Sequence, residues 1–571
     1  MKTHERALAA VVVALAIVVH AGALRAPFVL DDYAQHAMVT GTYPSHPGPL
    51  DLYDFVDDSS RAGLIERGIV PWWTHPKLVV RFWRPLASAI LWVDHRLFGQ
   101  HSFPYHLHSL LWWAVASLAV LALFRASFSP RVAAIGTAVF AFAPCHAVPL
   151  VWLANREVLV STAVGTMALL FYSRWREERR ARDGLASFAL FAVAMAAGEY
   201  TLSFAGYVVA MEAVRGRESV SRRATGLACF ALPAIAYLAV RSLLGYGAHG
   251  AGFYHDPLHD PGAYLRAAPR RAAVLLGAAW AELDDVSWAG ASTWALALAA
   301  VGTAAVLAAP LARVIRGLDE KERRRATWLL AGSLLSLAPV LSVEPSWRLL
   351  GVAMVGASAA IALVLDHAWF PAVRPARRGV AELTGIVALG LGFAHLVRAP
   401  LDTWLAIRAA TQAAAGFEER MDWVRDRGVR GATVIVVRAV SPEATLFAPL
   451  VIGDAAPARW RVLSFATGRS LLLRTDARSL DLVASQLPLF PVGPQNLFRD
   501  LDEPLRPGDS VQVAGMKATV LQNDAHSLPR RVRFEFDRDL DDPSLVWLTE
   551  DASGFRDQKL PPPGYGEPIM P

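Results

Sequence analysis

The sequence predicts a polytopic α-helical membrane protein with about 11 transmembrane helices, a long first outer loop and a C-terminal, mostly-β soluble domain. Of its 571 residues, 54% are hydrophobic and only 19% are charged, a composition typical of membrane proteins. Apolar runs long enough to cross a bilayer recur as far as residue 397. Beyond residue 398 the pattern changes to short strand-like runs that are separated by turn residues.

The predicted membrane spans follow these apolar runs. The first follows Lys2 and Arg6 and is long for a signal-peptide core, so we interpret it as a retained signal-anchor helix. The fifth and sixth are short, and we expect a tilted pair that meets near Gly198 and Glu199. The stretch Ala272–Ala281 is too short to span and is interpreted as an interfacial helix. The spans are 7–24, 105–124, 132–150, 157–173, 184–198, 200–214, 224–243, 291–312, 326–343, 348–367 and 379–397.

The basic loops predict the orientation. Five clusters of Arg and Lys all fall on the same side as the N-terminus, and the positive-inside rule makes that side cytoplasmic. The sequence therefore predicts a protein of the cytoplasmic (inner) membrane, with its N-terminus inside and with the loop 25–104 and the C-terminal domain outside. The clusters are Arg125 and Arg131; Arg174, Arg176, Arg179, Arg180 and Arg182; Arg215, Arg217, Arg222 and Arg223; Arg313, Arg316, Lys321 and Arg323–Arg325; and Arg374, Arg377 and Arg378.

The same pattern predicts four regions. Residues 1–398 form the transmembrane domain, and 399–428 form an amphipathic helical connector. Residues 429–560 form the β-rich domain outside the membrane. The Pro-rich tail, 561–571, is expected to be extended and poorly ordered.

A pair of carboxylates, Asp31 and Asp32, follows directly after the first span. Carboxylates at a membrane exit are costly when buried and are not needed for folding, so they suggest chemistry. They also open the long loop 25–104, which makes that loop a candidate reaction chamber. The alternative is that they cap the N-terminus of a short helix.

Further polar residues fall on the outer face in the predicted orientation. Their convergence on one face predicts an outer polar cavity. The alternatives are that the arginines extend to lipid headgroups, that the histidines are satisfied at helix ends, and that the glutamate pairs with a neighbouring helix. These residues are Lys77, Arg81, Arg84, His106, His146, Arg156, Glu199, Arg241 and Arg348.

Three motifs carry a family resemblance. The string Pro27-Phe28-Val29-Leu30-Asp31-Asp32 resembles the first-loop signature of C-type glycosyltransferases. Arg84-Pro85-Leu86, Leu97-Phe98-Gly99 and Tyr105-His106-Leu107 resemble their "RPL … LFG … YHL" block. The segment from Phe142 to Arg156 resembles the block that usually reads "HP-x-H-x-E-x-V … R". The resemblance is to the protein O-mannosyltransferase clan, especially bacterial relatives of the tetratricopeptide-bearing transmembrane O-mannosyltransferases, over residues 1–370 and most strongly over 25–215.

The chain also departs from that pattern. Ala143 stands where the first His is usual, and Val148 stands where a Glu is expected. Gly198 precedes Glu199 where the family often has Lys. The β domain replaces the tetratricopeptide tail. These departures bear on the substrate more than on the reaction class.

The resemblance implies an enzyme that moves a sugar from a polyprenyl-phosphate donor to an extracytoplasmic acceptor, either a protein or an envelope glycan or lipid. It implies that Asp31 or Asp32 is the base that takes the proton of the acceptor hydroxyl. Arginine forks suit the leaving phosphate, which points to Arg84, Arg156 or Arg348. We expect four residues to orient the substrates: His106, His146, Arg81 and Glu199.

The sequence indicates no resident cofactor. A Gly-rich nucleotide cradle is absent, which fits a lipid-linked donor rather than a nucleotide sugar. No metal-binding motif occurs, so no metal is expected, although some C-type relatives use a divalent ion. The expected partners are the lipid bilayer, the donor and an unidentified acceptor, and no nucleic acid.

Two other functions compete with this interpretation. A lipid or lipid-linked glycan transporter would also need Arg and His at the level of lipid phosphates. Transporters usually show repeated halves with polar residues in mid-membrane, and neither is evident here. The second alternative is a catalytically inactive membrane scaffold whose β domain binds envelope partners. Val148 supports this alternative, because it stands where the family pattern has a Glu.

Overall fold

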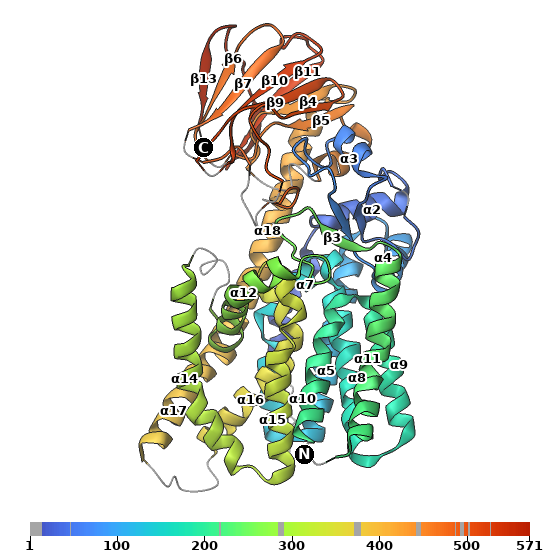
Figure 1. The fold of residues 1–571 in the computed structure, drawn as a ribbon, viewed down its shortest axis with the longest axis vertical. Helices are drawn as coiled ribbons and strands as arrows, with labels where there is room; N and C mark the ends of the chain where they lie inside the picture. Colours follow the sequence, from blue (N-terminus) through green and yellow to red (C-terminus); the bar gives the residue numbers. More distant parts are fainter. Residues whose placement is uncertain are drawn as a thin grey trace.

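The computed structural model describes residues 14–45, 47–215, 218–283, 291–370, 378–440, 447–466, 468–485, 487–490, 496–500, 503–525 and 527–570. A bundle of long helices forms one end of the molecule, and β-sheets form the other (Figure 1). Some predicted features lie outside the described residues. They are residues 7–13 of the predicted first span, and Arg217, Arg374 and Arg377 of the basic clusters.

The helix bundle confirms the prediction of a polytopic helical membrane protein. In the described residues, seven helical segments are long and apolar enough to cross a membrane, or eight if the bent pair Pro130–Ala141 and Pro144–Val151 is one span. Two more predicted spans are shorter helices. The first span is described only over Ala14–Arg25, so the count of eleven stays a prediction. The helices of the bundle are α5 (Ser102–Ser127), α6 (Pro130–Ala141), α8 (Glu157–Glu178), α9 (Ala181–Ala197), α10 (Ala205–Val214), α11 (Val220–Leu243), α14 (Thr293–Gly317), α15 (Glu320–Leu335), α16 (Gly351–Trp369) and α17 (Arg378–Phe393).

Small residues bring the central helices into close contact. A Cβ atom on Gly356 of α16 would lie 2.1 Å from the Leu329 carbonyl oxygen of α15, which only glycine tolerates. In the apolar 18-residue windows of Leu153–Glu178 and Trp347–Trp369, 78% and 94% of the residues are buried. In the window of Thr293–Gly317, only 17% are buried. Close packing of small residues replaces the hydrophobic effect as the cause of helix association in a bilayer. The two most buried segments also begin beside the candidate site.

Short irregular segments connect these helices at the end of the bundle nearer the sheets. The bend after α6 contains η2 and α7, and the predicted tilted pair meets at η4, directly after Gly198. The stretch predicted as an interfacial helix is helical, as α12, and begins eleven residues earlier than predicted, at Pro261; its position at the interface stays a prediction. The segments are η2 (Pro144–His146), α7 (Ala147–Val151), η3 (Leu153–Asn155), η4 (Glu199–Phe204), α12 (Pro261–Ala281), η5 (Pro339–Ser342) and η6 (Trp347–Leu350).

The first outer loop is folded rather than open. Its strands β1 and β2 pair antiparallel, and β2 pairs with β3 from the loop after α11. The side-chain amide of Gln35 donates to the Leu52 carbonyl at 3.1 Å and ties the first helix of the loop to its interior. The elements are η1 (Ala21–Arg25), α2 (Asp31–Thr40), β1 (Asp54–Val56), α3 (Arg61–Arg67), β2 (Val79–Arg81), α4 (Pro85–Phe98) and β3 (Gly247–His249).

The C-terminal domain is mostly β, as predicted. Its described strands form a six-stranded sheet in the order β13-β6-β7-β10-β9-β8 and a four-stranded sheet in the order β12-β11-β4-β5. The Pro-rich tail is extended, as predicted, but the expectation of poor order is wrong, because Gly566–Ile569 pairs with β6 as an edge strand. The strands are β4 (Thr433–Val436), β5 (Arg459–Val462), β6 (Ser470–Arg474), β7 (Ser479–Ala484), β8 (Ser510–Val513), β9 (Met516–Asn523), β10 (Pro529–Phe536), β11 (Leu545–Asp551), β12 (Gly554–Asp557) and β13 (Gly566–Ile569), with the short helices α20 (Ala448–Ile452) and η8 (Gly453–Ala455).

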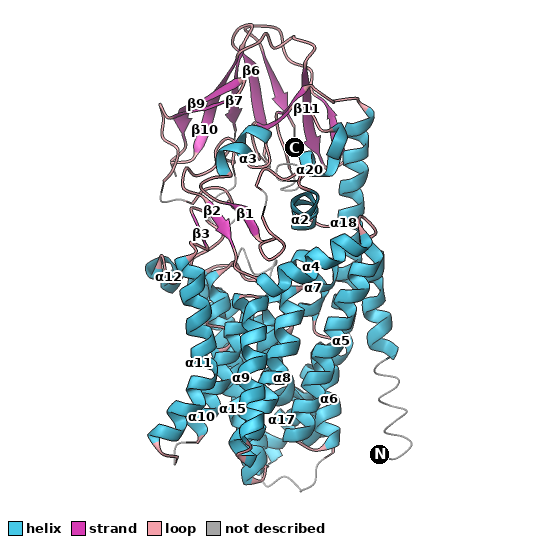
Figure 2. Cartoon of the chain, turned by 90° about the vertical axis from the view of Figure 1, so that its right-hand side faces the viewer, coloured by secondary structure: helices cyan, strands magenta, loops and turns pink. Residues whose placement is uncertain are grey.

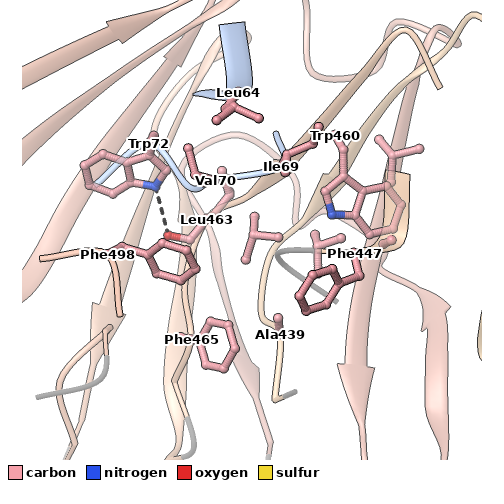
Figure 3. Packing of buried hydrophobic residues seen from close by; sticks show 14 of the residues in the cluster. Leu64, Ile69, Val70, Trp72, Ala439, Phe447, Trp460, Leu463, Phe465 and Phe498 are labelled. Atoms are coloured by element: carbon pink, nitrogen blue, oxygen red, sulfur yellow. Dashed lines mark hydrogen bonds between the residues drawn. The ribbon is translucent and has the colours of Figure 1, made fainter. Parts of the chain in front are cut away.

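The β domain and the first outer loop share one hydrophobic core. Figure 3 shows Leu64, Ile69 and Trp72 of the loop packed among side chains of the domain. The Trp72 indole donates to the Leu463 carbonyl at 3.3 Å. Gly68 has φ +77, and a Cβ there would lie 1.7 Å from the Trp460 carbonyl oxygen. The loop that carries Asp31 and the β domain are therefore one packed body.

A long helix joins this body to the bundle. Helix α17 continues through a π-helical turn, η7 (Ala394–Arg398), into α18 (Ala399–Asp426), which rises beside the bundle to the sheets (Figure 2). The predicted connector is thus confirmed as a helix, although no break separates it from the last span at residue 398. The hydroxyl of Tyr33 donates to Glu418 at 3.0 Å, so α18 also contacts the helix that follows the Asp pair.

Candidate active site

The Asp pair lies in the first turn of α2, at the end of the bundle that faces the β domain. The residue before it, Leu30, has φ +49 and ψ −116, a conformation that is strained for a residue with a side chain. Such strain persists only where the surrounding structure enforces it. It turns the chain sharply so that two adjacent carboxylates meet different surroundings.

Asp32 holds this turn in place. It is fully buried, and its carboxylate accepts hydrogen bonds from the backbone N–H groups of Val29 at 2.9 Å, Ala154 at 2.8 Å and Leu153 at 3.3 Å. Burial raises the pKa of Asp32 to about 7, and the three N–H donors act in the opposite direction. Asp32 therefore joins the start of α2 to η3, and its oxygens are occupied.

Asp31 is the available carboxylate of the pair. It is partly buried, and its side chain has no hydrogen bond or ion pair to any residue that the structure describes. Burial raises the pKa of Asp31 to about 7, against the opposing charges of Arg348 and Arg84, and Glu157 raises it further. A carboxyl group with a pKa near 7 can act as a base at neutral pH. The geometry favours Asp31 over Asp32 as the reacting group.

Arg348 is the cation that faces this carboxylate without a partner of its own. It lies in η6, where the indole of the neighbouring Trp347 donates to the Leu283 carbonyl at 3.2 Å. Its guanidinium carbon is 5.4 Å from the centre of the Trp152 ring. Within the described part of the chain, no carboxylate pairs with it. A guanidinium held over an aromatic ring, with its five donors free, suits a phosphate.

Tyr254 is a third member of this group. Its backbone pairs with Val343 in an isolated bridge, and its ring is 5.5 Å from that of Phe82. Burial raises the pKa of Tyr254 to about 12, with Arg348 and Asp31 among the charges that it faces. The phenol stays protonated, and its hydroxyl has no hydrogen-bond partner among the described residues. It is a neutral donor beside a base and a free cation.

A chain of alternating charges, here called the charge chain, supports the site. Arg84 donates to Glu157 through Nη1 and to Glu199 through Nε, both at 3.1 Å. Glu199 also faces Arg241, with Nε 3.6 Å away, and Arg241 pairs with Asp256 at 2.7 Å. The charge chain links α4, α8, η4 and α11 to the loop of Tyr254. Paired charges of this kind set positions rather than bind a further anion.

Arg84 occupies the space that Gly198 leaves. A Cβ on Gly198 would lie 3.2 Å from Nε of Arg84, and this glycine has φ +154. The Arg84 guanidinium also lies over the rings of Tyr53 at 4.9 Å and Phe82 at 4.6 Å. The departure from the family pattern at Gly198 thus makes room for Arg84. Two carboxylates already pair with Arg84, so the geometry favours Arg348 over it as the phosphate holder, and the phosphate role of Arg84 stays a prediction.

Arg156 is turned away from the Asp pair. Its side chain is 2% exposed, pairs with Asp94, and donates to Ser109 at 2.9 Å and to the Tyr105 carbonyl at 2.8 Å. Each of its three nitrogens thus donates a hydrogen bond to a buried protein group. These contacts join the start of α8 to α5 and α4, and the phosphate role of Arg156 stays a prediction that this geometry does not favour.

The two predicted histidines are also structural. His106 is fully buried, with Nδ1 3.0 Å from the Leu150 carbonyl oxygen. His146 is 1% exposed, with Nε2 2.9 Å from the Phe140 carbonyl oxygen. Neither has a contact with Asp31 among the described residues, and the prediction that they orient substrate stays a prediction. Arg81 is likewise engaged, because Nε lies 2.8 Å from Asp54.

Sequence reasoning missed Glu157 and Tyr254. Glu157 directly follows Arg156 at the start of α8, and a carboxylate in the first turn of an apolar span was a usable signal. Its Oε1 also accepts from the Asn155 amide at 3.2 Å. Tyr254 lies in a loop without periodicity or motif, so nothing in the sequence distinguished it.

Residues 75–242 match the family model of dolichyl-phosphate-mannose-protein mannosyltransferase. This match confirms the resemblance to the protein O-mannosyltransferase clan. It contains Arg84, Glu157, Glu199 and Arg241 of the charge chain. Asp31 lies before the matched segment, and Tyr254 and Arg348 lie after it.

Two solved structures resemble the chain at low identity. The oligosaccharyltransferase of Archaeoglobus fulgidus tethered with an acceptor peptide is 12% identical, with 79% of this chain and 63% of that chain covered and a TM-score of 0.41. ArnT from Cupriavidus metallidurans bound to undecaprenyl phosphate is 14% identical, with 92% and 97% covered and a TM-score of 0.40. The chain thus spans about 63% of the length of the archaeal enzyme. No curated protein matches the chain.

Proposed function

We propose that the protein is an integral-membrane glycosyltransferase that moves a sugar from a polyprenyl-phosphate-linked donor to an acceptor outside the cytoplasm. The acceptor is a protein or an envelope glycan or lipid. The observation that carries the proposal is the free carboxylate of Asp31 opposite the free guanidinium of Arg348. The match of residues 75–242 to the mannosyltransferase family supports the reaction class.

The proposed mechanism uses these groups directly. Asp31 takes the proton of the acceptor hydroxyl as its oxygen attacks the anomeric carbon of the sugar. The bond from that carbon to the phosphate oxygen breaks, and polyprenyl phosphate leaves with the electron pair. Arg348 stabilises the growing charge on the phosphate, and the Tyr254 hydroxyl donates a hydrogen bond to it. The charge chain keeps the walls of the site in position.

Mass spectrometry of envelope glycoproteins and glycolipids tests this function. Cells with the protein and cells that lack it are compared, and the chromosomal deletion is complemented with wild type or Asp31→Asn. We expect a hexose mass increment that disappears on deletion and returns only with wild type. Identical glycan profiles in all strains would reject the proposed function.

The pH dependence of transfer follows from the raised pKa of Asp31. The reactive form is the carboxylate, which predominates above pH 7 because the pKa is about 7. The rate should therefore fall about tenfold per unit as pH drops below 7, and it should level off above that value. Initial rates with a labelled donor, measured in buffers from pH 5 to 9, check this. A rate that does not change across that range would contradict the assignment.

We also propose that the donor's phosphate is held by Arg348 without a metal ion. The described residues contain no group of three or more His, Cys, Asp or Glu side chains arranged to hold one. Because the guanidinium supplies the positive charge, we expect transfer to proceed unchanged after dialysis against EDTA. Restoration of a lost rate by Mg²⁺ or Mn²⁺ would instead reveal a metal requirement.

The proposed location is the cytoplasmic (inner) membrane, with the N-terminus inside and the Asp pair and β domain outside. The five basic clusters support this orientation. Alkaline phosphatase fused after Pro571 should be active, and a fluorescent protein that matures only in the cytoplasm should stay dark there. The reverse pattern would place Asp31 on the cytoplasmic face and reject an extracytoplasmic acceptor.

A further inference from the structure

Two hollows open at the end of the bundle opposite the Asp pair. Helix α8 begins at Glu157 in the charge chain and ends at Glu178, roughly 30 Å further along the helix axis. There, a larger hollow of about 710 Å³ and a smaller one of about 530 Å³ lie side by side, lined by residues at the ends of α8, α9, α10 and α15. They share the lining residues Ser173, Glu177, Lys321 and Arg325. Neither belongs to the candidate active site.

Both hollows are strongly basic. Nine basic residues and four acidic residues line them together, so the cationic groups outnumber their local partners. An excess of this size in a cavity attracts anions rather than neutral ligands. The basic residues are Arg174, Arg176, Arg179, Arg180, Arg182, Arg215, Lys321, Arg324 and Arg325.

An ion-pair ridge separates the two hollows. Arg325 donates to both oxygens of Glu177, at 3.0 and 2.6 Å, and Lys321 lies 4.0 Å from the same carboxylate. On the larger side, Arg174 lies over the ring of Phe171 with no carboxylate partner in the described chain. An anion can therefore be held on each side while the ridge stays intact.

The smaller hollow has a rigid wall. Arg176 is 6% exposed and forms two hydrogen bonds of 2.8 Å with Glu212, which also accepts from Tyr172 at 2.8 Å. Glu218 accepts from Arg176, at 2.6 Å, and from Arg179 and Arg215 as well, so three guanidiniums share one carboxylate. That arrangement leaves net positive charge facing the hollow.

Apolar side chains complete the lining. Ala126, Phe171 and Ala186 face the larger hollow, and Met211, Val214 and Trp328 face the smaller. The hollows lie where membrane-spanning helices end, at the level of lipid headgroups. Basic pockets between helices at this level suit lipid phosphates, with the acyl chains beside the apolar residues.

We propose that this pair of hollows binds the headgroup of an anionic phospholipid that carries two phosphates, with one phosphate in each hollow. A lipid with a single phosphate would leave one basic hollow without a counter-ion. The site does not depend on the transfer reaction. Bound lipid would join α8 and α9 to α15, adding to the ion pairs that Glu177 of α8 forms with Arg325 and Lys321 of α15 at the ridge.

Native mass spectrometry of the purified full-length protein tests the site. The protein in detergent is titrated with diphosphatidylglycerol or phosphatidylglycerol. Arg174→Gln/Arg180→Gln removes two charges from the larger hollow, and Arg179→Gln/Arg324→Gln removes two from the smaller. Arg222→Gln/Arg223→Gln, at the same end of the bundle but lining neither hollow, is the matched control. The residues replaced in the hollows are exposed, so the fold should persist.

We expect wild type to prefer diphosphatidylglycerol, and each hollow variant to weaken its binding by about 10- to 30-fold. The control should keep wild-type affinity. An equal loss in the control would show a general effect of charge and overturn the site. A loss in only one hollow variant would overturn the two-phosphate assignment. Displacement of the lipid by an equal concentration of inorganic pyrophosphate would show a site for soluble anions and overturn the lipid.

Discussion

Asp31→Asn should lower the rate of sugar transfer by about 10²- to 10⁴-fold, the usual contribution of a general base. The amide keeps the shape of the side chain but cannot take a proton. Because the side chain of Asp31 has no hydrogen bond in the described structure, the substitution should leave folding and membrane insertion intact. Transfer from a radiolabelled polyprenyl-phosphate sugar, measured with purified protein, gives the rate.

Two other aspartates serve as controls for this variant. Asp58 is in the same loop, and its side chain is 84% exposed, so Asp58→Asn should transfer at the wild-type rate. Asp32→Asn should lower the melting temperature, because an amide replaces a carboxylate that accepts three backbone hydrogen bonds. A wild-type rate in Asp31→Asn would contradict the assignment of Asp31 as the general base.

Arg348→Lys should weaken binding of the donor while the acceptor binds almost as before. Lysine keeps the charge but loses the planar fork that matches two phosphate oxygens. Loss of a charge-assisted pair of this kind costs about 2–5 kcal/mol, by analogy with truncated buried pairs at interfaces. That corresponds to roughly 30- to 4,000-fold in affinity. Equilibrium binding of an unreactive donor analogue measures it.

Arg398→Lys is the matched control for Arg348. Arg398 is 41% exposed and pairs with Asp402 on its own helix at 3.0 Å, far from η6 in sequence. It should bind the analogue as wild type does. If Arg348→Lys also binds the donor as tightly as wild type, Arg348 only contacts lipid headgroups. That result would contradict its role in binding the donor phosphate.

The sequence predicted the fold class because the relevant signals are local. Apolar runs located the spans to within a few residues, as the helix at Val220–Leu243 shows against the predicted 224–243. Amphipathic spacing located the connector, now α18. The edge strand Gly566–Ile569 could not be predicted, since its only support is a pairing with β6 about 95 residues earlier.

The site was harder to predict than the fold. Sequence placed Arg156, His106 and His146 near the outer ends of helices, but it does not state which way a side chain points around the helix axis. All three point into the bundle and satisfy buried backbone or side-chain groups. Asp31 and Asp32 were equivalent by sequence. Only the strained turn at Leu30 separates a carboxylate that holds structure from one that is free.

Photo-crosslinking with an unreactive polyprenyl-phosphate sugar analogue, which carries its photoreactive group beside the phosphate, tests the central claim most directly. Labelled peptides are mapped by mass spectrometry, with excess unlabelled polyprenyl phosphate as competitor. We expect competed labelling in η6 around Arg348 and in the loop of Tyr254, at the same end of the bundle as Asp31. Labelling confined to the basic hollows near Arg174 and Lys321, with none around Arg348, would contradict a donor site at Asp31.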